Sequence, residues 1–146
     1  MASLSDARWI AGVAVAYFLA AKLGLALATV GVTVTLVWPP SGVAVAAMLL
    51  RGPRVWPGVV IGAFAANATT DAPLSVAVFT AIGNPLEAVV AATLLRRVGA
   101  FDAALERARD VISLTIFGAA MPAMVGATIG VAGLLFGVCV AILDSW

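Results

Sequence analysis

Five uninterrupted apolar stretches dominate this sequence and limit what it can fold into. They cover residues 9–28, 41–50, 55–70, 74–95 and 111–143. Of the 146 residues, 64% are hydrophobic and only 10% are charged, whereas soluble domains carry about a quarter charged residues. Because about 20 residues of helix cross a bilayer, we predict an all-α, polytopic integral membrane helical bundle with about five spans. This leaves no length for an aqueous catalytic domain.

The ionisable residues exclude several kinds of site. The chain has no histidine and one cysteine, Cys139, so we expect no imidazole base, no metal centre and no intrachain disulfide. The net charge of +1 gives no reason to expect nucleic-acid binding. Glu87 has no nucleophile partner in the pattern, and we therefore expect no enzymatic activity, no catalytic residues and no cofactor.

The second apolar stretch, 41–50, is too short to cross a membrane. Its ten residues would rise about 15 Å as a helix, which is half of a hydrocarbon layer of about 30 Å. Residues 30–37 alternate Val and Leu with Gly and Thr, which predicts an extended approach to Trp38. We therefore predict a half-length, broken second helix that begins inside the membrane. Free N–H groups at Ser41 and Gly42 and a positive dipole end are expected there.

Basic residues lie on one side of the predicted spans. Seven arginines precede the first span, separate the second from the third, or separate the fourth from the fifth: Arg8, Arg51, Arg54, Arg96, Arg97, Arg107 and Arg109. Short cytoplasmic loops collect Lys and Arg. We therefore predict a multi-pass protein with a cytoplasmic N-terminus and an extracytoplasmic C-terminus.

Two further patterns each allow two interpretations. Phe101, Leu105, Ala108 and Ile112 recur at helical spacing, which predicts either the start of the fifth span or an amphipathic segment that docks a partner. Glycines four residues apart lie within the spans: Gly58 and Gly62, Gly126 and Gly130, and Gly133 and Gly137. Such spacing allows close helix packing, either within one chain or at the seam of a homodimer.

Polar side chains within the spans are the strongest functional signal, because a charged group in hydrocarbon costs about 2.5 to 3.5 kcal/mol. Counted along each helix from its basic end, five of them fall in one band near mid-depth: Lys22, Ser41, Asn67, Asn84 and Glu87. Asn84 and Glu87 share a helix face, and Pro85 should break or kink their helix. This pattern predicts a polar pocket. The alternative is a structural ion pair between Lys22 and Glu87.

The same residues carry a family resemblance. Residues 38–42 and 50–58, Asn67 and the Gly-Asn-Pro-Leu-Glu run at 83–87 resemble the signature of the bacterial membrane-associated sensor domain, type one (MASE). The resemblance covers about residues 15 to 135. It implies an input domain in the bacterial inner membrane, usually fused to a histidine kinase of a two-component system or to a diguanylate cyclase of cyclic-di-GMP signalling.

Domains of that family have more helices than we predict here, and they end in the cytoplasm. Residues 1–146 are therefore expected to form one sensor module that is incomplete, the N-terminal part of such a domain without its output domain. An alternative is that another polypeptide supplies the missing half.

We hypothesise a non-enzymatic sensor that binds a small ligand or ion in the mid-membrane pocket and changes its helix packing. The ligand-binding residues would be Trp38, Ser41, Asn67, Asn84 and Glu87, with Lys22 as the counter-charge. A small transporter or permease component is an alternative use of the same pocket, and a module that recruits a partner through loop 98–110 is a third. The expected partners are the lipid bilayer, a small ligand and a kinase or cyclase output domain, fused or separate.

Overall fold

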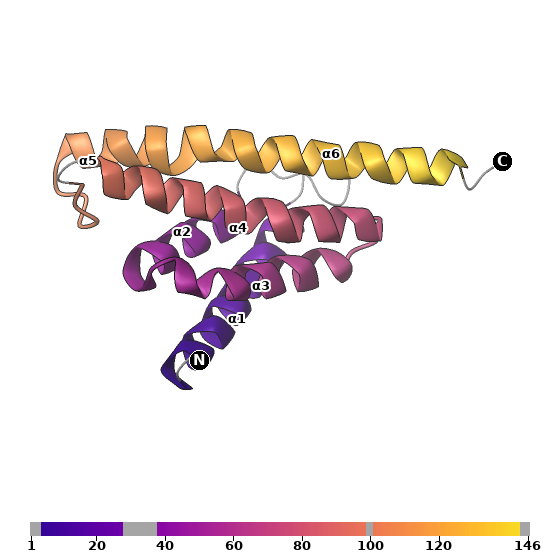
Figure 1. Ribbon diagram of the computed structural model, residues 1–146, viewed down its shortest axis with the longest axis horizontal. Coiled ribbons are helices and arrows are strands. Elements are labelled where there is room, and N and C mark those ends of the chain that lie inside the picture. The colour runs from indigo at the N-terminus through magenta and orange to yellow at the C-terminus, as the bar shows by residue number, and fades with distance from the viewer. Residues whose placement is uncertain (1–3, 28–37, 99–100, 144–146) are drawn as a thin grey trace.

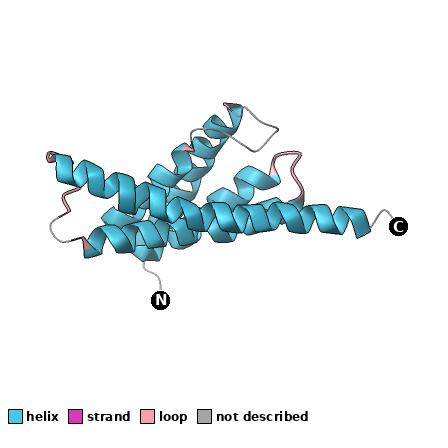
Figure 2. Cartoon of the chain, turned by 90° about the horizontal axis from the view of Figure 1, so that it is seen from above, coloured by secondary structure: helices cyan, strands magenta, loops and turns pink. Residues whose placement is uncertain are grey.

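The computed structural model describes residues 4–27, 38–98 and 101–143, and within these ranges it contains only helices and the loops that connect them (Figure 2). The elements are α1 (Leu4–Ala26), α2 (Pro39–Arg51), the 3-10 turn η1 (Pro53–Val55), α3 (Trp56–Ala68), α4 (Leu74–Arg97), α5 (Ala108–Ser113), the π-helix η2 (Leu114–Ala120) and α6 (Met121–Leu143). The predicted helical membrane bundle is confirmed. The segment 30–37, predicted to be extended, lies outside the described residues.

Three of the described helices are long and apolar enough to cross a membrane. They are α1, α4 and the helix Ala108–Val140, which α5, η2 and α6 form together. In contrast, α2 and α3 contain 13 residues each and rise about 20 Å, less than the hydrocarbon thickness of about 30 Å. A short second helix is therefore present as predicted, although its rise is about two-thirds rather than half of that thickness, and the third apolar stretch forms a helix of the same length.

Helix α4 lies at the centre of the bundle (Figure 1). On one side it packs along α6, which runs in the opposite direction, and on the other it packs against α2 and α3. Helix α1 packs on α2 and α3 and crosses them obliquely. Helix α4 is therefore the element on which both α6 and the pair of α2 and α3 pack.

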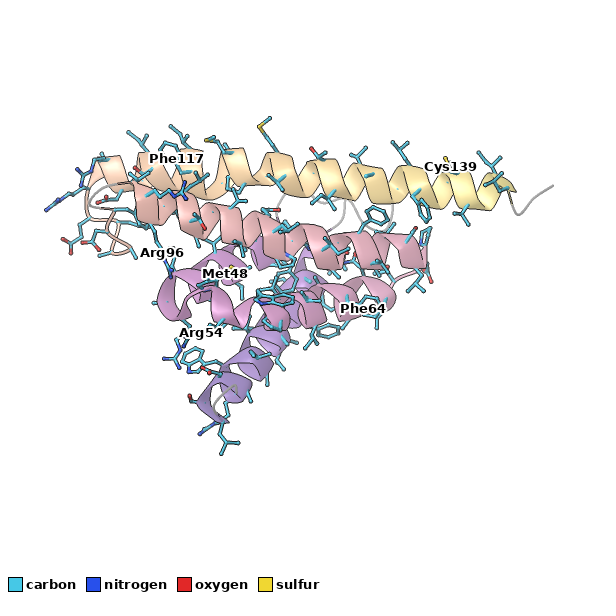
Figure 3. The ribbon with its side chains drawn as sticks, viewed as in Figure 1. Met48, Arg54, Phe64, Arg96, Phe117 and Cys139 are labelled. Carbon is cyan, nitrogen blue, oxygen red and sulfur yellow. The ribbon has the colours of Figure 1, made fainter. Side chains whose placement is uncertain are left out.

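The connections that carry arginines lie at one end of the bundle, which we call the basic end. The Arg51 guanidinium lies 4.2 Å from the centre of the Trp9 ring in α1. Nη2 of Arg96, near the end of α4, donates to the carbonyl of Met48 at 2.7 Å, and Figure 3 shows these two residues together. The Met48 carbonyl also accepts from the N–H of Gly52 at 2.9 Å. Arg96 therefore adds a second donor at the end of α2, and its positive charge suits the negative end of that helix dipole.

The glycines explain how closely the helices pack. A Cβ atom at Gly58 would lie 2.5 Å from the carbonyl oxygen of Ile10, and one at Gly62 would lie 2.8 Å from that of Ala14. This pair therefore joins α3 to α1 within one chain, as one of the two interpretations predicts. In α6 the contacts with α4 are made by Gly126, Gly133 and Gly137, while a Cβ at Gly130 would meet nothing within 4 Å.

Two local predictions need correction. Helix α4 continues without a break through Pro85. The spacing of Phe101 and Leu105 does not mark a helix, because helical structure begins only at Ala108 and Leu105 has a φ of +58°.

Hydrogen bonds to side chains explain the irregular loop. The Asp110 carboxylate accepts from the N–H of Asp102 at 3.3 Å, and the Asp102 carboxylate accepts from the N–H of Ala104 at 2.9 Å. Local bonds of this kind compete with helical ones.

Candidate functional site

The candidate site lies where α2 begins beside the middle of α4. The first two residues of α2 are Pro39 and Pro40, which suit these positions because the first helical N–H groups have no intrahelical partner. The N–H of Ser41 donates to the carbonyl of Trp38 at 3.2 Å. The prediction that the Ser41 N–H is free there is therefore wrong, because the Trp38 carbonyl accepts it and the two prolines before it have no N–H.

The side chain of Ser41 makes the polar contact instead. Its Oγ donates to Oε1 of Glu87 at 2.9 Å, which joins α2 to α4. The positive end of the α2 dipole also lies at this level and favours a carboxylate there. Ser41 and Glu87, which are 46 residues apart in the sequence, thus form the polar centre of the site.

A second hydrogen bond joins α4 to α1 nearby. Nδ2 of Asn84 donates to the hydroxyl of Tyr17 at 2.7 Å, and the side chain of Trp38 is another hydrogen-bond partner of this hydroxyl. Tyr17 is fully buried. We did not predict it as a site residue, although a signal exists: it is the only tyrosine in the chain and lies inside an apolar stretch.

The third side of the site is the backbone of α6. A Cβ atom added at Gly126 would collide with Oε2 of Glu87, and one at Gly83 would lie 3.1 Å from Cγ2 of Ile129. The glycine at 126 therefore leaves room for the carboxylate between α4 and α6. Through its two oxygens, Glu87 touches the starting turn of α2 and the backbone of α6.

A groove of about 780 Å³ extends from this pair along α2. Apart from Ser41 and Glu87, its lining is apolar or aromatic and comes from α2, the loop after α4, η2 and α6: Trp38, Gly42, Val45, Ala46, Leu49, Leu50, Phe101, Ala103, Leu105, Leu114, Gly118, Ala119 and Ala123. Because Leu49 and Leu50 lie at the end of α2, the groove runs from mid-depth toward the basic end.

The π-helix forms part of the groove wall. Segment η2 has seven residues, of which Leu114, Gly118 and Ala119 line the groove. A Cβ at Gly118 would lie 2.8 Å from Cδ1 of Leu114 and 3.1 Å from Cδ1 of Leu95 in α4, so the wider turn is tightly packed on its inner side. Segments of π-helix occur frequently at functional sites, and none of our sequence patterns marked this one.

Comparison with known proteins agrees with this architecture. The MASE1 family model matches residues 9–139, nearly the whole chain. The chain belongs to the MASE1 family. MASE1 domains are membrane-associated sensor domains of signal transduction, and the resemblance based on residues 38–42 and 83–87 is confirmed. No curated protein and no solved structure matches the chain.

Two predicted site residues lie elsewhere in this MASE1 domain. Asn67 is buried and donates to the carbonyl of Ala63 one turn earlier in α3 at 3.0 Å. Nζ of Lys22 donates to the carbonyl of Thr69, just after α3, at 3.2 Å. Lys22 thus lies at the end of α3 away from the basic end, rather than beside Glu87, because its long side chain reaches toward the interface.

The alternative ion pair is not found either. Among the described residues, no salt bridge joins Lys22 to Glu87. The polar centre of the MASE1 domain is therefore made by Tyr17, Trp38, Ser41, Asn84 and Glu87. A carboxylate beside a hydroxyl at the end of an apolar groove can hold one hydrogen-bond donor or cation, which is an arrangement suited to binding.

Proposed function

We propose that this MASE1 domain senses its stimulus by binding a small ligand or ion at Ser41 and Glu87 and then changing how α2 and α6 pack on α4. The observation that carries the proposal is the 2.9 Å hydrogen bond from Ser41 to Glu87 at the inner end of the groove. A ligand that brings its own donor or positive charge competes with the Ser41 hydroxyl for Glu87. Trp38 and Asn84 border the same centre and complete the proposed ligand-binding residues.

A ligand shifts a conformational equilibrium only by binding one state more tightly than the other. Glu87 meets this requirement because its carboxylate lies between two helices. One oxygen bonds to the start of α2, and the other faces the backbone of α6 at Gly126. A ligand that draws the carboxylate into the groove therefore weakens both its hydrogen bond to Ser41 and its packing against Gly126.

The signal is proposed to pass to a histidine kinase or diguanylate cyclase, fused or separate. The arginines at the basic end support placing that end in the cytoplasm of a bacterium. The N-terminal turn of α1, the turn after α2 and the loop after α4 would then all face the cytoplasm, where either output enzyme works.

Binding is tested on the domain in lipid nanodiscs with a panel of metal cations, primary amines and alcohols. We expect at least one member to raise the thermal stability of the parent, and Ser41→Ala and Glu87→Gln to abolish that shift. Thr128→Ala and Glu106→Gln are matched controls, because Thr128 donates to the Met124 carbonyl of its own helix and Glu106 is exposed in the loop. No shift with any member, or an equal shift in all variants, contradicts the proposal.

Flux of a binding compound separates sensing from transport. In proteoliposomes we expect stabilisation without counterflow of the compound. Counterflow that depends on Glu87 would instead assign the groove to a transporter.

A further inference from the structure

Away from the groove, two clefts at the basic end share Trp9 as a common wall. The first, of about 260 Å³, is lined by Asp6, Trp9, Leu50, Arg51, Arg54 and Val55. The second, of about 490 Å³, is lined by Ser5, Arg8, Trp9 and Gly12. Together they hold three arginines and one aspartate, so the pair of clefts is net positive and attracts an anion.

The local structure fixes the two arginines of the first cleft. The Arg51 guanidinium lies 4.2 Å from the centre of the Trp9 ring, and stacking of this kind leaves the N–H groups at the edge of the guanidinium plane available to an anion. After Arg51 the chain turns through Gly52, with a φ of +81°, and Pro53 before it reaches Arg54. This turn places both arginines on the same cleft.

The level of the cleft in the membrane indicates where the anion comes from. Tryptophans concentrate at the headgroup level of a bilayer. Trp9 is 44% exposed and Trp56, two residues after Arg54, is 51% exposed. Leu50, which also lines the cleft, is 75% exposed. The cleft therefore brings together cationic, aromatic and aliphatic side chains, the three kinds of group that the phosphate, glycerol and acyl regions of a lipid would contact.

We propose that this cleft binds the phosphate of an anionic phospholipid. Arg51 and Arg54 donate to the phosphate oxygens, as guanidinium groups do in phosphate sites, and Trp9 and Leu50 contact the glycerol and the upper part of the acyl chains. The negative charge of Asp6 limits the net charge of the first cleft, which favours a phosphodiester with one negative charge over a polyphosphate. Arg51 is the last residue of α2, so the bound lipid also restrains the helix that carries Ser41.

Native mass spectrometry of the purified domain tests the proposal. Phosphatidylglycerol and phosphatidylcholine with identical acyl chains are offered in equal amounts. The parent should retain phosphatidylglycerol preferentially, and the double variant R51Q/R54Q should retain it about thirtyfold less, the effect expected for two interfacial basic residues. The matched control R97Q/R107Q removes the same charge from exposed arginines at the same end and should keep the parent's preference.

Each remaining result contradicts the proposal. Equal loss in both double variants would show general charge attraction without a site, and equal retention of the two lipids would show that the phosphate charge is not recognised. Glycerol 3-phosphate is added as the soluble phosphate probe. If it displaces phosphatidylglycerol at millimolar concentration, the cleft binds a soluble phosphate and the lipid assignment is wrong. Circular dichroism of both double variants confirms that they are folded before lipid retention is compared.

Discussion

Helix α4 and the helix formed by α5, η2 and α6 are both apolar enough to cross a membrane, but they are packed very differently. In an 18-residue apolar window of α4, 39% of the residues are buried, whereas in the corresponding window of Ala108–Val140 only 6% are. Helix α4 also makes side-chain hydrogen bonds to α1 and α2, while α6 approaches it through glycines. Hydropathy therefore identifies both as membrane helices but does not distinguish the centre of the bundle from its edge.

The difference shows which contacts hold the bundle together. Among lipid chains there is no hydrophobic driving force between helices, so close packing and interhelical hydrogen bonds stabilise them instead. The α1–α4 part has both kinds of contact, whereas the α6 seam has close packing alone among the contacts that we describe. We therefore expect substitutions in the first part to reduce stability more than equivalent substitutions in α6.

The largest effect is expected at the seam between α1 and α3. In Gly62→Ala the new Cβ would lie 2.8 Å from the carbonyl oxygen of Ala14 and 2.9 Å from Cβ of Tyr17, and overpacking of this kind costs about 1 to 3 kcal/mol. The free energy of unfolding in detergent measures this loss. The matched control is Gly130→Ala in α6, where the new Cβ would meet no neighbouring group of the described residues within 4 Å and a gain of about 0.5 to 1 kcal/mol is expected. Equal losses at both positions would remove the contrast between the two regions.

A smaller effect is expected where the two regions meet. Gly126→Ala places a Cβ against the Glu87 carboxylate, but the carboxylate is the far end of a flexible side chain and can shift, so we expect a loss near the lower end of the overpacking range, about 1 kcal/mol. The loss should disappear in the double variant Gly126→Ala with Glu87→Ala, which removes the colliding group. Thermal unfolding of the four variants of this cycle measures the interaction. A double variant as unstable as the sum of the singles would show that Glu87 does not face Gly126.

The hydrogen bond between α1 and α4 should contribute less again. A double-mutant cycle of Tyr17→Phe and Asn84→Ala should give a coupling energy of about 0.6 kcal/mol, and at most about 1.7 kcal/mol, the range for interhelical hydrogen bonds in membranes. Thr80→Ala provides a comparison within α4, because the Thr80 hydroxyl donates to carbonyls of its own helix, those of Val76 and Ala77. Zero coupling would mean that the 2.7 Å contact does not stabilise the fold.

The smallest change in stability is expected in the groove. A Cβ at Gly42 would meet nothing within 4 Å although Gly42 lines the groove, so Gly42→Ala should raise stability by about 0.5 kcal/mol. The added methyl narrows the space beside Ser41 and should weaken binding of any panel compound that stabilises the parent. Stability and binding are measured on the same nanodisc samples, and unchanged binding would place the ligand away from this wall.

The sequence predicted the part of the site that follows from the free-energy cost of placing polar side chains in hydrocarbon. Ser41, Asn84 and Glu87 are polar groups within apolar stretches, and such groups need partners there, so their meeting near mid-depth could be expected. Tyr17 was missed because its ring resembles any other apolar side chain until its hydroxyl has a partner. Lys22 was placed too near the centre because residue counting follows the backbone and not the reach of a long side chain.

The remaining differences depend on contacts between helices. Nothing in residues 114–120 by themselves marks a π-helix. It lies where Gly118 packs on Leu95 of α4, a contact that the local sequence does not reveal. The loop before α5 is stabilised by hydrogen bonds from backbone N–H groups to the carboxylates of Asp102 and Asp110. The spacing of apolar residues does not predict such bonds. Spacing predicts which face of a helix is apolar, but the partner determines the details of its geometry.

Helix α4 holds α2 at two levels, through Glu87 at the beginning of α2 and through Arg96 at its end. Both helices run toward the basic end. The two attachment points are nine residues apart on α4 and seven apart on α2, or about 13 Å and 10 Å of helix. While the hydrogen bonds at Glu87 and at Arg96 both persist, they oppose sliding of α2 along α4 and separation of the two helices. In the proposed function, loss of the bond between Ser41 and Glu87 alone would leave α2 attached to α4 only at Arg96, and a ligand that binds at Glu87 would then rotate α2 about its far end.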